Sequence, residues 1–397
     1  CRDLKVICEG HLDLLGAPPE MDRYLFQLMV VGSGYGGLEH RASTSLICGR
    51  ADLPRVGQDK ISAGYRTLLA LSSHEYFHTW NVKRIKPAVF LPYDLSKETN
   101  TTLLWAFEGI TSYYEPLGLI RTKVIEPDVY LELVGRRLSD VTRRPGRYKQ
   151  SVADSSFDAW TKFYKQDENS SNAIVSYYSK GAMVALALDL TIRRDTDGAR
   201  SLDDVMRALW ERYGKPGIGV PESGVEDVAT ETSGLDLRDF FDNAVRGTGD
   251  IELTDLLQTF GVRLSMRPRE GAKDRGGKPG STSLETAMAR GHLGVLVRAN
   301  TATVQSVIDD GPAMRAGLSA GDVLIAMNDI KVGTDVLDRV AELNPGTTVQ
   351  IHAFRRDQLM RFDVQLSAPP CDTVALSIDP DADEQAVARR RTWMYGA

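Results

Sequence analysis

The chain has 397 residues, of which 42% are hydrophobic and 26% are charged, and its formal net charge is −6. This composition is typical of a globular protein with a large core and more than one domain. The negative charge argues against a nucleic-acid-binding protein, and the longest apolar run, residues 182–192, is too short to span a membrane and contains Asp189.

The N-terminal part of the chain predicts a small β-rich region. Residues 24–31 and 43–48 are rich in strand-forming side chains, and the stretch between them, 32–37, is rich in glycine. The chain opens at Cys1 in the middle of a pattern, so we expect a further region before it. Four scattered cysteines (Cys1, Cys8, Cys48 and Cys371) favour a reducing compartment, and we expect the cytoplasm.

Residues 74–78 read His-Glu-Tyr-Phe-His and lie within an apolar stripe, residues 61–80, that predicts a buried helix ending before Pro87. Side chains four residues apart stack on one face of a helix, so His74 and His78 can bind one metal ion. Glu75 then lies beside the metal as a candidate general base. The motif predicts a hydrolytic site with one Zn²⁺ ion.

A site of this kind needs a third protein ligand, normally a glutamate from the following helix. Glu98 is one candidate, but it lies in a polar stretch after Pro92 that is typical of a loop. Glu108 interrupts the apolar, aromatic-rich segment 103–114, which predicts a buried helix. Because a buried carboxylate needs a partner, we favour Glu108 as the third ligand.

Three separate runs carry a family resemblance: 74–87 (HEYFHTWNVKRIKP), 105–114 (WAFEGITSYY) and 36–41 (GGLEHR). Together they resemble the glycyl aminopeptidase family, the sixty-first family of metallopeptidases, over residues 24–261. The resemblance implies a catalytic domain similar to that of the aminopeptidase N group. It also implies removal of one N-terminal residue, with Gly or Ala suggested by the family name.

The resemblance assigns further roles. In the wider group a Gly-x-x-Glu strand holds the α-amino group of the substrate, which implies substrate binding by Gly36, Gly37 and Glu39. The residues themselves allow an alternative, a glycine-rich turn with an exposed glutamate. A tyrosine before x-Lys-Gly in the family implies that Tyr178 stabilises the oxyanion, with its neighbour Tyr177 as the rival.

Residues 80–87 are also shared with the family. Asn81, Lys83 and Arg84 allow hydrogen bonds to a ligand histidine or contacts with a substrate carboxylate. We favour a simpler interpretation, in which cationic side chains stabilise the C-terminal end of the metal-binding helix before Pro87.

The pattern changes after residue 265. Residues 266–283 collect Pro, Gly, Lys and Asp and predict a linker. Short strands at 293–297, 302–307, 323–327, 349–354 and 360–366 follow, and the runs 292–295 and 310–324 resemble a PDZ domain over 284–368. That resemblance implies that a peptide carboxyl terminus binds at Leu293, Gly294 and Val295. We expect 369–397 to form a polar tail.

The expected fold class is α+β. A mostly helical, thermolysin-like gluzincin domain with a small β-rich edge would occupy 1–265, followed by a β-barrel-like PDZ domain. The expected function is a zinc aminopeptidase acting on peptides with a free N-terminus, with Glu75 and Tyr178 as catalytic residues. The alternative is a PDZ-guided endopeptidase, or a scaffold that uses the peptidase fold to bind peptides.

Overall fold

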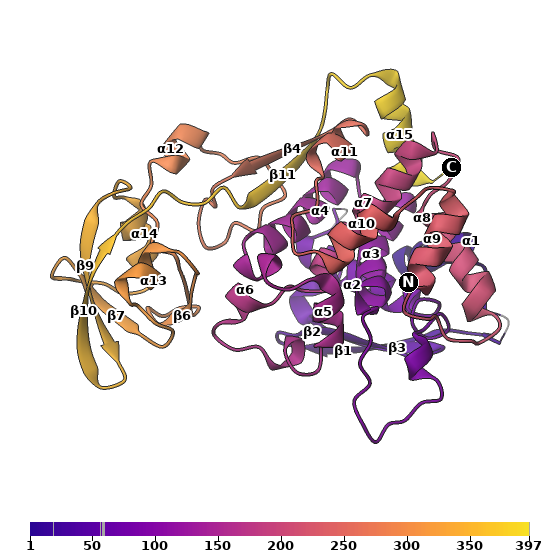
Figure 1. The fold of residues 1–397 in the computed structure, drawn as a ribbon, viewed down its shortest axis with the longest axis horizontal. Helices are drawn as coiled ribbons and strands as arrows, with labels where there is room; N and C mark the ends of the chain where they lie inside the picture. The colour runs from indigo at the N-terminus through magenta and orange to yellow at the C-terminus, as the bar shows by residue number, and fades with distance from the viewer. Residues whose placement is uncertain (19, 56, 58–59, 397) are drawn as a thin grey trace.

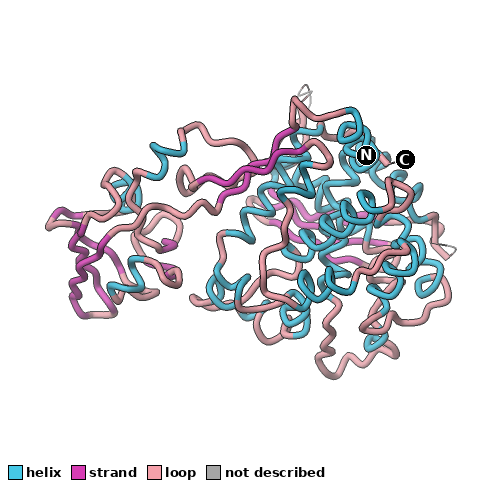
Figure 2. The backbone as a smooth tube through the Cα atoms, turned by 45° about the horizontal axis from the view of Figure 1, so that its top comes forward, coloured by secondary structure: helices cyan, strands magenta, loops and turns pink. Residues whose placement is uncertain are grey.

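The computed structural model describes residues 1–18, 20–55, 57 and 60–396. A large helical body and a smaller β-rich unit are joined by two neighbouring strands (Figures 1 and 2). The larger body contains the candidate site, and each of the two parts has its own cluster of buried apolar side chains. No helix within the described residues is both long and apolar enough to cross a membrane.

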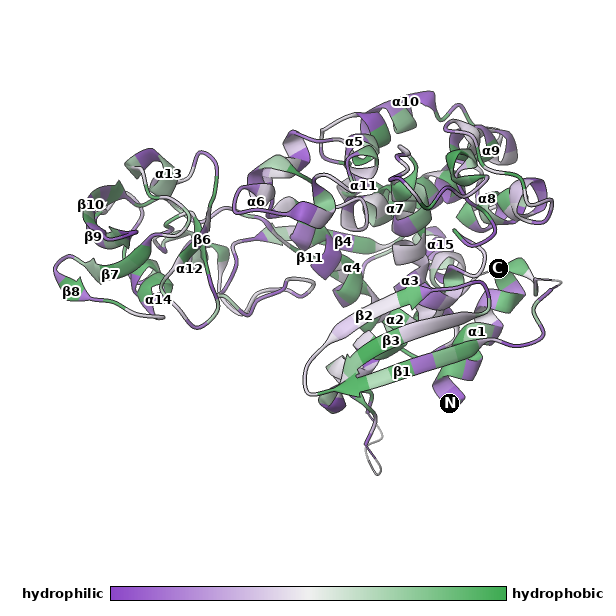
Figure 3. Cartoon of the chain, turned by 90° about the horizontal axis from the view of Figure 1, so that it is seen from below, coloured by the Kyte–Doolittle hydropathy of each residue, from purple (hydrophilic) through white to green (hydrophobic). Residues whose placement is uncertain are grey.

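The β-rich edge of the large body is a three-stranded sheet that packs on helices α1 (Arg2–Leu15) and α2 (Ala63–Phe77) (Figure 3). The strands are β1 (Leu25–Val31), β2 (Tyr35–Glu39) and β3 (Ser43–Gly49), in the order β1-β3-β2. Glu39 pairs with the buried Thr44, so both side chains face the helices. The glycine-rich stretch therefore contributes a strand as well as a turn.

Helix α2 carries the two histidines at its C-terminal end. Ser62 caps the start of the helix by accepting a hydrogen bond from the Tyr65 amide. The helix ends at Phe77, and His78 is its C-terminal cap, so the predicted continuation toward Pro87 is wrong. The chain turns instead at Val82, whose φ of 148° is incompatible with a helix.

The segment with Glu108 begins with a π-helical turn, η3 (Trp105–Gly109), which leads into α3 (Ile110–Arg121). The predicted buried helix is confirmed, and the π-turn at its start is an addition that is frequent at functional sites. Helix α3 packs between α2 and α7 (Ser179–Asp195), and α4 (Pro127–Thr142) covers its other side.

Shorter helices complete the large body. A capping box at Ser201 begins α8. Gly234 adopts a left-handed conformation and ends α9. The α-helices here are α5 (Val152–Phe157), α6 (Ser170–Ala173), α8 (Leu202–Leu209), α9 (Gly224–Ser233), α10 (Arg238–Phe241) and α11 (Thr254–Gln258).

The smaller unit is inserted between two strands of the large body. Strand β4 (Val262–Arg267) enters it, and β11 (Thr373–Ile378) returns antiparallel to β4. Helix α15 (Glu384–Tyr395) then packs on the large body, where Trp393 is fully buried. The segment expected as a polar tail is therefore part of the helical body, because its few apolar side chains are spaced to reach the core.

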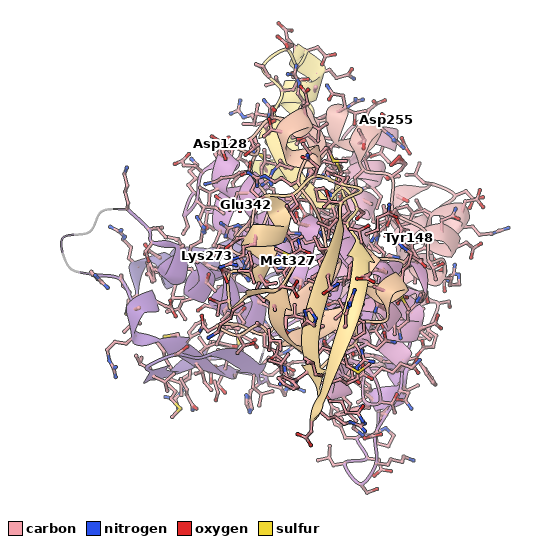
Figure 4. All side chains as sticks on the ribbon, turned by 90° about the vertical axis from the view of Figure 1, so that its left-hand side faces the viewer. Asp128, Tyr148, Asp255, Lys273, Met327 and Glu342 are labelled. Atoms are coloured by element: carbon pink, nitrogen blue, oxygen red, sulfur yellow. The ribbon has the colours of Figure 1, made fainter. Side chains whose placement is uncertain are left out.

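The inserted unit contains α12 (Leu284–Met288), α13 (Pro312–Ala316) and α14 (Val336–Ala341). Its strands form a four-stranded sheet, β10-β9-β7-β8, and a separate pair, β5-β6, so no closed barrel forms among the described residues. Figure 4 views this unit end-on, with Met327 and Glu342 in front of the helical body. The strands are β5 (Val295–Val297), β6 (Val304–Val307), β7 (Val323–Met327), β8 (Ile330–Lys331), β9 (Thr348–Arg355) and β10 (Gln358–Gln365).

Candidate metal centre and active site

Two imidazoles and one carboxylate converge between α2 and the π-turn. The Nε2 atoms of His74 and His78 lie 3.4 and 3.3 Å from the same oxygen, Oε2 of Glu108. That oxygen is buried and receives no hydrogen bond among the described residues. Ligands of a tetrahedral zinc ion with bonds of about 2.0–2.1 Å lie about 3.3 Å apart, so this donor set fits Zn²⁺ in both chemistry and spacing.

The alternative third ligand does not reach this cluster. Glu98 lies in an exposed loop and belongs to neither of the two groups of metal-binding side chains that the described residues bring together. The first of these groups contains His74, His78 and Glu108, and the second contains Glu39, Glu75 and His78.

A second carboxylate, which the sequence analysis missed, orients His74. Oε2 of Glu115 lies 3.3 Å from Nδ1 of His74 and 3.2 Å from Nη2 of Arg137. Glu115 follows Glu108 by seven residues, so the two side chains project from the same face of one helical segment. This seven-residue spacing is the sequence signal that could have identified Glu115. A carboxylate on the second ring nitrogen fixes the orientation of a metal-binding histidine.

Asn81 links the two elements that carry the candidate ligands. Its backbone carbonyl lies 2.7 Å from Nδ1 of His78. Its side-chain Nδ2 lies 3.1 Å from each of three acceptors, the carbonyls of Ala106 and Phe107 and the hydroxyl of Thr111. Asn81 therefore supports the histidine and the π-turn together, while Arg84 donates to the carbonyl of Thr79 just beyond the end of α2, as the helix-end interpretation of this run expects.

Burial and neighbouring charges shift the pKa values of the clustered histidine and glutamate side chains in opposite directions. Burial lowers the pKa of His74, but the carboxylates of Glu108 and Glu115 beside its two ring nitrogens outweigh this effect and raise the pKa to about 10. Burial raises the pKa of Glu115, but Arg137 and His74 lower it to about 2. The carboxylates are therefore ionised at neutral pH and can neutralise a bound cation.

Glu75 faces strand β2 rather than the ligand oxygen of Glu108. Its Oε2 atom is buried without a hydrogen-bond partner among the described residues, and burial raises its pKa. A Cβ atom on Gly37 would lie 2.1 Å from Oε1 of Glu75, whereas one on Gly36 would meet nothing within 4 Å. Only Gly37 of the two predicted glycines therefore packs directly on the candidate base.

Glu39 reaches the same place from the inner face of β2. Ligand atoms of Glu39, Glu75 and His78 lie within 4.8 Å of one another. In the structure Oε1 of Glu39 pairs with Nζ of Lys83 at 2.9 Å. The exposed-turn alternative for Glu39 is therefore wrong.

The two candidate tyrosines lie side by side, with ring centroids 4.7 Å apart. The ring of Tyr178 stacks near that of His74, with centroids 6.4 Å apart. Tyr177 is buried and donates its hydroxyl hydrogen to Tyr164, whose oxygen also lies 3.4 Å from that of Tyr178. Burial raises the pKa of Tyr178, so its phenol stays protonated and can donate a hydrogen bond.

Lys180 and Gly181 hold the start of α7 against neighbouring segments of the helical body. Nζ of the buried Lys180 donates to the carbonyls of Arg147 and Gly249, both at 3.2 Å. A Cβ atom on Gly181 would lie only 2.9 Å from the carbonyl oxygen of Trp105. The missing side chain lets the start of α7 approach the π-turn that carries Glu108.

The loop at Leu293, Gly294 and Val295 lies in the inserted unit, away from these residues (Figure 1). Gly294 has a φ of 78°, which favours glycine, and Val295 begins β5. Among the described residues, β5 pairs with β6 alone, so its other edge is open to a further strand. This arrangement is compatible with the predicted peptide-binding loop.

The inserted unit also touches the helical body beside the candidate site. Nδ2 of Asn172 donates to the carbonyl of Val307 at 2.8 Å, and its Oδ1 accepts from the Asp309 amide at 3.0 Å. Ser306 donates to the carbonyl of Glu168 at 2.6 Å. These contacts join β6 to the segment that precedes Tyr177 and Tyr178.

Comparison with known proteins agrees with this arrangement. An aminopeptidase N family protein from Idiomarina loihiensis has a solved structure that is 40% identical, with a TM-score of 0.92 over 99% of this chain and 65% of that chain. Probable periplasmic serine endoproteases described as DegP-like are also similar over short regions. The one from Pseudomonas putida (strain W619) is 32% identical over 87 residues, which is 21% of this chain and 18% of that protein. The one from Brucella suis biovar 1 is 36% identical over 73 residues, or 18% and 14%.

The chain thus spans about two thirds of the length of the solved relative and less than a fifth of these two endoproteases. A family model described as M61 glycyl aminopeptidase matches residues 67–184, which contain His74, Glu75, His78, Glu108 and Tyr178 but not Glu39. A PDZ domain model matches residues 264–366. The protein therefore carries an M61 glycyl aminopeptidase domain together with a PDZ domain.

Proposed function

We propose that this protein is a zinc-dependent aminopeptidase that releases N-terminal residues, with Gly and Ala preferred, from peptides. The main observation in favour of the proposal is that Nε2 of His74 and Nε2 of His78 lie 3.3–3.4 Å from Oε2 of Glu108. This buried oxygen receives no hydrogen bond from the described residues. When bound there, zinc would supply the Lewis acidity that polarises a peptide carbonyl and acidifies a water molecule.

The side chains around this centre divide the remaining work. Glu75 is buried, and its Oε2 receives no hydrogen bond from the described residues; it accepts the proton of the attacking water and returns it to the leaving amine. Tyr178 donates a hydrogen bond to the developing oxyanion. Glu39 binds the α-ammonium group of the substrate, which fixes the cleaved bond one residue from the N-terminus.

The PDZ domain supplies a second peptide contact. We infer that a peptide carboxyl terminus binds the loop at Leu293, Gly294 and Val295, with its backbone adding a strand to the open edge of β5. The carboxylate would take hydrogen bonds from backbone amides of the loop. The proposed partners are therefore peptides, bound by the amino end at one site and by the carboxyl end at the other.

The proposal is tested by hydrolysis of glycyl and alanyl anilides, and of their N-acetylated forms, with and without a zinc chelator. We expect cleavage of the free-amine substrates alone and its loss with the chelator. Equal cleavage of acetylated and free substrates would remove the exopeptidase assignment and favour a PDZ-guided endopeptidase. Chelator-resistant cleavage would remove the zinc mechanism.

A substitution at Glu75 tests whether this residue is the general base and not a metal ligand. Glu75→Gln should keep the zinc content of the protein and reduce kcat by about 10²- to 10⁴-fold, because it removes only the proton acceptor. Glu98→Gln, in an exposed loop, is the matched control and should match the parent protein in both measurements. Loss of zinc from Glu75→Gln, measured by elemental analysis, would contradict the role of Glu75.

A further inference from the structure

A cation of the chain itself occupies the place where the proposed function puts the substrate amine. Nζ of Lys83 lies 2.9 Å from Oε1 of Glu39, and the two side chains are 26% and 20% exposed. Glu39 in turn lies with Glu75 and His78 in one group of candidate ligand atoms. The ammonium group of Lys83 therefore sits at the edge of the candidate catalytic centre.

The backbone ties Lys83 to the metal-binding helix. The Lys83 amide donates to the carbonyl of His78 at 3.0 Å. Val82, just before it, has a φ of 148°, a conformation that L-residues rarely adopt. The side chain of Lys83 reaches β2, where it pairs with Glu39.

The ammonium group itself is held only by Glu39. Among the described residues, Nζ of Lys83 has no other ionic partner and no hydrogen bond to a carbonyl. The neighbouring Arg84 differs, because Glu20 and the carbonyls of Arg41 and Thr79 hold its guanidinium group and its side chain is buried. A lysine ammonium on a flexible four-carbon stem can withdraw from one partner at low cost, whereas Arg84 is fixed.

We propose that Lys83 determines substrate specificity by acting as an internal substitute for the substrate ammonium group at Glu39. This inference rests on the proposed function, because it requires Glu39 to be the amine-binding residue. A peptide that enters the site must displace Lys83 from Glu39, or share the carboxylate with it. Lys83 thereby weakens the binding of every free amino terminus and has no such effect on an acylated one.

The test uses the zinc-loaded full chain and compares free and N-acetylated alanyl anilides. Lys83→Met should lower the KM for the free amine by about two- to fivefold, the value of one partly exposed ion pair, with a small change in kcat. The KM of any residual acetylated reaction should not fall. Lys83→Arg should behave as the parent protein, and Lys97→Met, at an exposed lysine paired with Asp94, is the matched control.

A second measurement uses ethylammonium ions as inhibitors of the free-amine reaction. Lys83→Gln should be inhibited at a lower ethylammonium concentration than the parent protein, because Glu39 is then unoccupied. Unchanged KM in Lys83→Met and unchanged inhibition in Lys83→Gln, with normal zinc content in both, would overturn the role of Lys83.

Glu39→Gln distinguishes failure of the inference about Lys83 from failure of the proposed function. If this variant loses the preference for free amines while the Lys83 variants are unchanged, the proposed function stands and the inference about Lys83 is wrong. If Glu39→Gln keeps the preference, the amine-binding role of Glu39 fails and the inference about Lys83 fails with it.

Discussion

Single buried hydrogen-bonding groups determine how well the three candidate ligands are held. Asn81 places its backbone carbonyl on one histidine and its amide on the start of the π-turn, so one residue fixes two elements that are 25 or more positions apart in the chain. Ala106 and Phe107 are buried, and removal of the amide takes one hydrogen-bond donor from each of their carbonyls.

We expect Asn81→Leu, which is similar in size but has no donor, to bind zinc about 10- to 100-fold more weakly. The backbone contact to His78 remains, so the change reports on the π-turn alone. Competition with a chromophoric chelator measures the affinity, and Asn100→Leu, in an exposed loop, is the control. Parental zinc affinity in Asn81→Leu would show that the amide does not position the ligand.

Two adjacent glycines provide a second comparison at this scale. Gly37→Ala places a Cβ atom 2.1 Å from Oε1 of Glu75 and must displace that carboxylate, whereas Gly36→Ala meets nothing within 4 Å. We expect a fall in kcat of at least about tenfold for Gly37→Ala, since a small misplacement of a catalytic group is costly. Gly36→Ala should retain parental kcat. Equal kinetics in both variants would contradict the close packing of β2 on Glu75.

At the scale of secondary-structure elements, the ends of helices bring the site together. The C-terminal end of α2 meets the π-turn before α3 at the candidate ligands. Gly109 and Gly181 permit the close approach of this π-turn to the first turn of α7. Helix α1 supports α2 from behind, through a contact between the buried His11 and the hydroxyl of Ser73 at 2.8 Å.

The α1–α2 contact makes stability depend on pH. Burial, assisted by the charge of Arg121, lowers the pKa of His11 to about 3 from an ordinary value of 6.5. Between these values the unfolded chain binds a proton that the folded chain does not. The free energy of unfolding therefore falls as the pH drops from 6.5 toward 3, by at most about 1.4 kcal/mol per pH unit from this group.

His11→Gln should remove this contribution and flatten the dependence of Tm on pH over that window. His40→Gln, at an exposed histidine, should keep the parental slope. Denaturation followed by circular dichroism between pH 4.5 and 7 measures both. Identical slopes for His11→Gln and the parent protein would show that His11 is not buried in its neutral form.

At the scale of the whole molecule, the PDZ domain interrupts the peptidase body rather than following it. Strands β4 and β11 form an antiparallel pair on either side of the insertion, and α15 returns to the core. Nε1 of Trp393 donates to the hydroxyl of Tyr113, which in turn donates to the buried Asp189. The last residues of the chain thus stabilise α3 and α7.

This arrangement predicts opposite outcomes for two deletions. Replacing residues 284–368 by a short Gly-Ser linker should leave a folded peptidase body, because β4 and β11 can pair as a hairpin. Ending the chain at residue 368 should prevent stable folding, because it removes β11 and the buried Trp393. Soluble yield and cooperative thermal unfolding measure both. A stable, zinc-binding protein ending at residue 368 would contradict the structural role of the C-terminal segment.

The sequence by itself identified the candidate metal ligands and the class of the fold. The spacing of His74 and His78, the lone Glu108 in an apolar segment and the period-two strands after residue 290 are local patterns, and local patterns follow from helix and strand geometry. Tyr178 and Glu39 needed the additional family resemblance, because tyrosines and glycine-rich turns are common in cores and loops.

Only the tertiary structure decided which groups contact these residues and hold them in place. Glu115 on His74, Asn81 on the π-turn and Lys83 on Glu39 are contacts between elements, and their partners depend on how helices and strands pack. The insertion of the PDZ domain was likewise hidden, because pairing of β4 with β11 spans more than 100 residues. Long-range pairing leaves no periodic signal in either strand, whereas the zinc motif is complete within five residues.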